Sequence, residues 1–165
     1  TAAAWFYAVT NKTTPTSLVL TRQNLPLYDI DGKVALKGAY ILKDSKNETP
    51  DVILMASGSE VELIMGAADE LAKKGVDARV VSMPSFELFE AQSDEYKESV
   101  LPKAVRNRVA VEAASTFGWH KYVGLDGEVI GLDHFGASAP AGTLFKEFGF
   151  TVENVVETAL KVVGK

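Results

Sequence analysis

The turn Ser57-Gly58-Ser59 is the first place where the residue types could do chemistry. It follows the apolar run Val52–Ala56 and precedes a helical pattern, so it is predicted to join a buried strand to a helix. Free backbone amides and the positive end of a helix dipole suit an anion at such a turn. The turn lacks the GxGxxG and Walker patterns, however, and every doubly wound protein needs turns of this kind. A structural turn is therefore favoured, and a small-anion or nucleotide-binding regulatory module at Gly58-Ser59 is the alternative.

Arg22 is the second candidate, because it directly follows the apolar run 17–21 in a segment that carries an excess of basic residues. A guanidinium at the end of a strand can bind a phosphate or a carboxylate through two parallel hydrogen bonds. An ordinary surface arginine is the alternative that the spacing leaves open.

The remaining polar candidates favour structural roles. Glu112 follows the apolar run 108–111, where a carboxylate would repel phosphate but could cap a helix or hydrogen-bond across a subunit contact. His120 and His134 are the only histidines, and their separation of 14 residues does not match a metal-binding spacing. Ser138 lies in a loop of small residues without an evident base. The residues alone therefore predict no catalytic, cofactor-binding or metal-binding side chain.

Apolar runs and helical spacing alternate along the chain. Strands are predicted at residues 17–21, 38–42, 52–56, 78–83, 108–111 and 128–132. Helices are predicted at residues 2–9, 61–72, 86–89, 94–100, part of 114–123 and from 152 onward, with a linker or loop at 27–37. Strands that alternate with helices imply a parallel sheet covered on both faces.

The connection between residues 38–42 and 52–56 is too short for a crossover helix, so these two strands must be antiparallel if they share the sheet. The predicted fold is α/β, with a mixed five-stranded sheet that has one antiparallel edge strand. Ser59 is predicted to cap the following helix in a capping box with Glu62, and Thr151 is predicted to cap the last helix.

Composition narrows the class of protein. The 165 residues suffice for one domain with a core, and a net charge of −5 argues against a nucleic-acid partner. Neither a membrane-spanning run nor a secretory signal is evident, and the absence of cysteine suits the cytoplasm, where we expect the protein. Residues 1–45 carry five basic against three acidic side chains, whereas the remainder carries 12 against 19.

The start of the chain has the features of a cut end. Residues 2–9 are rich in alanine and aromatics, and Trp5-Phe6-Tyr7 is too apolar for a free terminus. We expect residues 1–10 to be the last helix of a domain that precedes this chain, with an amphipathic tail helix as the alternative.

Nine segments occur in an order that resembles the C-terminal part of the transketolase family, in its bacterial form. They are T-R-Q-N-L-P (21–26), G-A-Y-I-L-K-D (38–44), A-S-G-S-E-V (56–61), R-V-V-S-M-P-S-F-E-L-F (79–89), V-L-P (100–102), V-A-V-E-A (109–113), G-W-H-K-Y-V-G (118–124), F-G-A-S-A-P-A (135–141) and F-G-F-T-V-E-N-V-V (148–156). The first and fourth are specific within the wider thiamine-dependent superfamily.

The resemblance implies a fragment of a longer enzyme. Residues 1–35 correspond to the end of the domain that holds the cofactor's pyrimidine, plus a linker, and residues 36–165 to a three-layer α/β/α C-terminal domain. The full-length enzyme would transfer a two-carbon ketol unit between ketose and aldose phosphates in the pentose phosphate pathway, as a homodimer with thiamine diphosphate and Mg²⁺ or Ca²⁺. The fragment would bind neither cofactor nor metal and would be inactive, with a structural and dimerisation role.

The resemblance assigns one functional residue. The arginine of the family's S/T-R-Q-N-L motif binds the phosphate of the sugar-phosphate substrate, and it matches Arg22. Glu112 does not match the family's pyrimidine-activating glutamate, and His134 receives no role.

Overall fold

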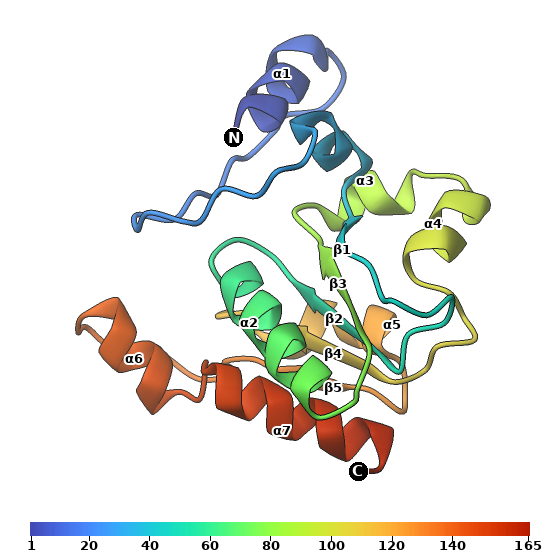
Figure 1. Cartoon of the computed structure of the whole chain (residues 1–165). Coiled ribbons are helices and arrows are strands. Elements are labelled where there is room, and N and C mark those ends of the chain that lie inside the picture. Colours follow the sequence, from blue (N-terminus) through green and yellow to red (C-terminus); the bar gives the residue numbers. More distant parts are fainter.

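The computed structural model describes residues 1–165. Helix α1 (Ala2–Thr10) and an extended stretch lead to the short 3₁₀ helix η1 (Gly32–Lys37), and a sheet domain follows (Figure 1). No helix is long and apolar enough to cross a membrane. The predicted helix at the start of the chain is confirmed, whereas η1 replaces part of a predicted linker.

Five strands form one mixed sheet in the order β1-β3-β2-β4-β5. Their bounds are Tyr40–Lys43 (β1), Val52–Ala56 (β2), Ala78–Ser82 (β3), Arg108–Val111 (β4) and Glu128–Ile130 (β5). Strand β1 pairs antiparallel with β3 at one edge, and all other neighbours are parallel. The predicted antiparallel edge strand is confirmed, but its partner is β3 and not its neighbour in sequence.

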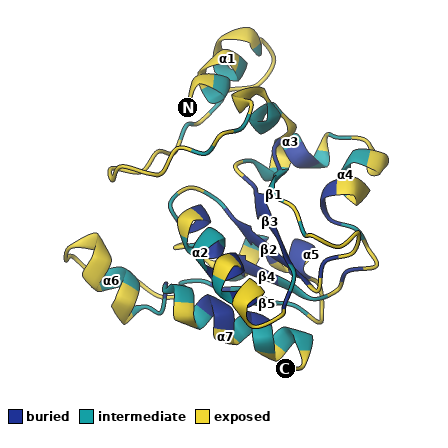
Figure 2. Ribbon diagram, in the orientation of Figure 1, coloured by how far each residue is buried: buried dark blue, intermediate teal, exposed yellow.

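Helices cover both faces of the sheet (Figures 1 and 2). Helices α2 (Glu60–Lys73) and α7 (Val152–Val163) lie over one face, and α3 (Phe86–Glu90), α4 (Asp94–Val100) and α5 (His120–Val123) cover the other. Strand β2 divides its buried residues between two apolar clusters, with Leu54 facing α2 and Ile53 and Met55 on the opposite side. The three-layer α/β/α fold is confirmed.

The predicted strand at residues 17–21 is wrong. This stretch is irregular, and Val19 is 95% exposed. A strand needs a neighbouring backbone to satisfy its amides and carbonyls, and none lies beside these residues in the sheet. Helix α6 (Ala141–Glu147) and the 3₁₀ turn η2 (Thr116–Gly118) complete the elements, and α6 was not predicted.

The predicted capping box at Ser59 is also wrong. The backbone of Ser59 is already helical, and its hydroxyl donates to Glu60 Oε1 at 2.6 Å rather than accepting from an amide of the first turn. An N-cap side chain reaches that amide only from an extended backbone, which Thr151 has. The Thr151 hydroxyl accepts from the Asn154 amide at 3.2 Å, so the predicted cap of α7 is confirmed.

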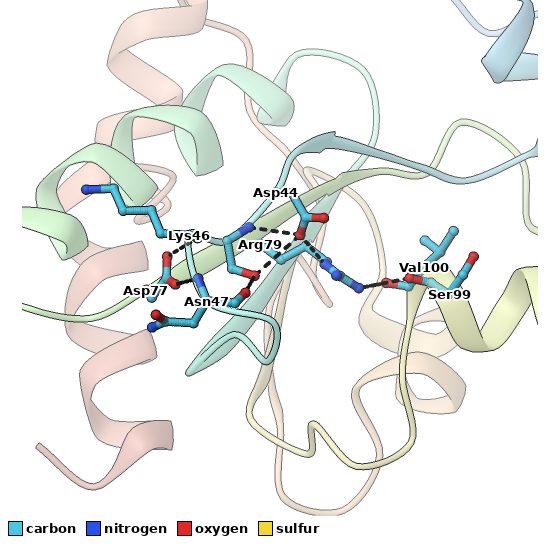
Figure 3. A network of polar contacts seen from close by, with 8 residues as sticks. Asp44, Lys46, Asn47, Asp77, Arg79, Ser99 and Val100 are labelled. Carbon is cyan, nitrogen blue, oxygen red and sulfur yellow. Dashed lines mark hydrogen bonds and ion pairs between the residues drawn. The ribbon is translucent and has the colours of Figure 1, made fainter.

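A polar network holds the connection between β1 and β2 against the sheet (Figure 3). Buried Arg79 of β3 donates to Asp44 Oδ1 at 2.7 Å and to the Ser99 carbonyl at 2.9 Å. Burial raises the pKa of Asp44, but the hydrogen bonds from Arg79 and the Ser45 amide outweigh this effect and lower it. Asp77 accepts from the backbone amides of residues 46 and 47, at 3.0 and 2.8 Å.

Candidate functional site

The carboxyl ends of β2 and β4 define the point where ligands usually bind in an open α/β sheet. These two strands are adjacent and parallel, and the chain leaves β2 toward β3 on one side before it returns to β4 on the other. Such a reversal of strand order leaves a crevice outside the strand ends. Here the turn Ser57-Gly58-Ser59 follows β2, and Glu112 follows β4.

Two carboxylates lie at this point. The Ser57 hydroxyl donates to Glu112 Oε2 at 2.6 Å, which joins the ends of β2 and β4. Burial raises the pKa of the Glu112 carboxyl, with the negative charge of Glu60 acting in the same direction and the Ser57 hydrogen bond opposing it. Glu60 itself is 3% exposed and accepts from Ser59.

The electrostatics of the turn are unfavourable for a phosphate. A phosphate at Gly58 would lie beside the carboxylates of Glu60 and Glu112. The negative charges of these carboxylates would repel the negative charge of the phosphate. The amide of Glu60 already donates to the Ser57 carbonyl at 3.2 Å, so it is not free for a ligand. The geometry therefore favours the structural interpretation of this turn.

Arg22 lies on the irregular stretch between α1 and η1 and is exposed. Its guanidinium forms no hydrogen bond and no ion pair with the chain. The basic charge is therefore free for a ligand from outside, which an arginine committed to a structural ion pair would not be.

The structure places the stretch that carries Arg22 close to the Gly58 turn, although Arg22 and Gly58 are 36 positions apart in sequence. The γ-methyl group of Thr21, the residue before Arg22, lies 3.8 Å from the position that a Cβ on Gly58 would take. No other atom outside the immediate chain neighbours comes within 4 Å of that position. No local pattern in the sequence signals that these two segments lie close together.

Tyr28 attaches the irregular stretch between α1 and η1 to the sheet domain. Its ring packs against the apolar cluster beneath α2, and burial, followed by the charge of Glu62, raises the pKa of its hydroxyl. The segment from Thr21 to Tyr28 therefore rests on the sheet domain at both ends.

The two histidines do not form a site. His120 begins α5 on the surface, and His134 stacks edge-on against Phe148 with ring centroids 5.3 Å apart. No group of three or more histidine, cysteine, aspartate or glutamate side chains could hold a metal ion.

Asp133 holds the loop that contains Ser138, a role that the sequence did not reveal. Its carboxylate accepts from the Thr116 amide (2.9 Å), the Thr116 hydroxyl (2.8 Å) and the Ser115 hydroxyl (2.9 Å). These hydrogen bonds, that from the Thr116 amide first, lower the pKa of Asp133. An aspartate directly after the predicted strand 128–132 is the only signal that could have indicated it. Ser138 is exposed and lies outside this network.

Comparison with known proteins identifies the family. Residues 38–151 match the model of the transketolase-like TK C-terminal domain. The chain belongs to this family. The transketolase of Bacillus subtilis (strain 168) is 56% identical over 169 residues, which cover 100% of this chain and 25% of that protein. The chloroplastic transketolase of Zea mays is 53% identical over 163 residues, or 96% of this chain and 24% of that protein.

Solved transketolases have the same fold. Transketolase from Leishmania mexicana aligns with a TM-score of 0.91 at 43% identity, over 99% of this chain and 23% of that chain. Transketolase from Pichia stipitis in complex with sedoheptulose-7-phosphate aligns with a TM-score of 0.90 at 44% identity, over 99% and 23%. The resemblance drawn from the sequence motifs is confirmed, and the chain spans about a quarter of the length of these relatives.

Proposed function

We propose that this chain is the C-terminal quarter of a transketolase, which transfers a two-carbon ketol unit between ketose and aldose phosphates in the pentose phosphate pathway. The observation that carries the proposal is a similarity that extends over the whole chain at 56% identity, with the fold preserved over 99% of it. Thiamine diphosphate, held with Mg²⁺ or Ca²⁺ by the preceding domains, would stabilise the carbanion. The cytoplasm is the proposed location.

The proposed division places the end of the pyrimidine-binding domain and a linker at residues 1–35, and the C-terminal domain at 36–165. Exposed apolar side chains support it, since Trp5 and Phe6 are each 59% exposed and Leu27 is 99% exposed. A surface of this kind is normally covered by protein. The preceding domain is the proposed cover, and the C-terminal domain would contribute to the contacts of a homodimer.

Arg22 is the proposed binding residue for the phosphate of the sugar substrate. Its guanidinium is exposed and has no partner within the chain, so its hydrogen-bond donors are available. A phosphate accepts two parallel hydrogen bonds from a guanidinium, which fixes both the position and the orientation of the sugar.

The activity test compares the full-length protein with residues 1–165. We expect the full-length protein, supplied with thiamine diphosphate and Mg²⁺, to transfer ketol units in a coupled assay. Residues 1–165 are expected to give only the background rate, because they lack the preceding domains. Turnover by residues 1–165 alone, or none by the full-length protein, would refute the proposal.

Arg22→Ala in the full-length protein tests the phosphate contact. We expect the KM for a phosphorylated ketose to rise by about 10-fold or more, because a hydrogen-bonded charge is lost. The KM for an unphosphorylated ketose should stay unchanged. Lys12→Ala, on the same exposed stretch, serves as the matched control. An unchanged KM for the phosphorylated substrate would remove Arg22 from the site.

A further inference from the structure

A phosphate-binding arginine must be held in place, yet the Arg22 guanidinium forms no hydrogen bond or ion pair within this chain. Its position is therefore set through the backbone beside it. Thr21 is that neighbour, and its γ-methyl group lies 3.8 Å from the position that a Cβ on Gly58 would take. The support for Arg22 is thus the turn between β2 and α2.

This turn is fixed to the sheet by one long-range hydrogen bond. Ser57, directly before Gly58, donates its hydroxyl to Glu112 Oε2 at 2.6 Å, across 55 positions of sequence. Glu112 is itself immobilised, because its amide donates to the Ile130 carbonyl at the end of β5. The ends of three adjacent strands are therefore tied together beneath the turn.

Gly58 leaves space for Thr21 beside the turn. Its φ is +52°, and it has no side chain between the turn and the nearby Thr21 methyl group. A displacement of the turn would move Thr21 and, with it, the adjacent Arg22. Displacements of about 1 Å are enough to weaken a precisely oriented contact by large factors.

We propose that Ser57 and Glu112 are positioning residues for the substrate phosphate, because they hold the turn that supports Thr21 and Arg22. The proposal rests on the proposed function, in which Arg22 binds the phosphate. It assigns to the C-terminal domain a part in substrate affinity, although this domain carries none of the predicted chemistry.

The test uses the full-length enzyme with Ser57→Ala, Glu112→Ala and Glu112→Gln. KM and kcat are measured with a phosphorylated ketose and with an unphosphorylated one. We expect Ser57→Ala and Glu112→Ala to raise the KM for the phosphorylated substrate by about 3- to 10-fold, since the supporting turn loses its anchor. Both constants for the unphosphorylated substrate should stay within about twofold of the parent enzyme.

Glu112→Gln distinguishes positioning from charge. A glutamine carbonyl still accepts from Ser57, so this variant is expected to keep the KM of the parent enzyme for both substrates. The matched control is Glu157→Ala, an exposed carboxylate on α7 away from the turn. It should change neither KM.

Arg22→Ala separates the two ways in which the proposal can fail. If Arg22→Ala raises the KM for the phosphorylated substrate but Ser57→Ala and Glu112→Ala do not, the positioning role is wrong and the phosphate role stands. If Arg22→Ala itself has no effect, the phosphate role and the positioning role both fail. If the Ser57 and Glu112 variants lose the same factor in kcat/KM for the phosphorylated and the unphosphorylated ketose, these residues have only a general structural role.

Discussion

At the residue scale, the contribution of a charged side chain to stability depends on whether its removal leaves buried hydrogen-bond partners unpaired. Arg79 is 7% exposed and donates to Asp44 and to the carbonyls of Ser99 and Val100. Its loss would leave the carbonyl of buried Val100 without this donor, and an unpaired buried acceptor costs more than a neutral hydrogen bond contributes. Arg106, by contrast, pairs with Asp126 on the surface, where water can replace either partner.

Arg79→Met is therefore expected to lower the unfolding free energy of residues 1–165 by about 2–3 kcal/mol. Breaking a fully buried ion pair would cost more, but Asp44 is half exposed. Arg106→Met is the matched control and should change the unfolding free energy by less than about 1 kcal/mol. Urea unfolding followed by circular dichroism measures both. Equal losses in the two variants would show that burial of Arg79 does not decide its contribution.

At the element scale, the junction between η1 and β1 depends on close packing against α3. Gly38 has a φ of +83°, and a Cβ added there would lie 2.1 Å from the Phe89 amide nitrogen and 2.5 Å from the Ser85 carbonyl oxygen. Both atoms belong to backbone, so they cannot move aside as a flexible side chain would. The edge strand β1 is thereby positioned by a contact that only glycine permits.

Gly38→Ala should separate α3 from this junction. We expect a loss of about 3 kcal/mol or more, which combines a left-handed backbone with overpacking. Gly75→Ala has a similar φ of +70° but nothing within 4 Å of the new Cβ, so it should cost only about 1–2 kcal/mol. Thermal unfolding of both variants gives the difference, and equal costs would exclude the steric explanation.

At the scale of the whole molecule, the residues that precede the sheet domain contribute little to its core. Both buried clusters lie between residues 39 and 159, and Tyr28 is the one side chain of residues 1–35 that packs against them. This distribution supports the proposed boundary after residue 35. It also explains why the apolar side chains of α1 remain on the surface.

Residues 36–165 are therefore expected to fold without the preceding segment. The unfolding free energy should fall by no more than about 2 kcal/mol, which is the burial of one aromatic side chain. Urea unfolding of residues 36–165 tests this, and Tyr28→Ala in residues 1–165 should account for most of the loss. A truncated protein that lacks a cooperative transition would refute the boundary.

The local elements and the family follow largely from the amino-acid sequence. Continuous apolar runs such as Val52–Ala56 identify buried strands, because a strand covered on both faces must be apolar along its whole length. The motifs that resembled transketolase also predicted the fold and pointed to Arg22. The predicted strand at residues 17–21 and the Ser59 capping box failed because local preference does not reveal whether a partner backbone or an extended cap is present.

The contacts between residues far apart in the sequence become known only from the folded chain. The order of the strands places β1 beside β3 and Ser57 beside Glu112, and the path of the irregular stretch brings Thr21 close to Gly58. The pairing of residues on different strands depends on the order of the strands in the sheet. Hydrophobic periodicity predicts a strand but does not predict which other strand will be its neighbour. The proposed role of Arg22 therefore comes from its motif, whereas the residues near it in space are visible only in the fold.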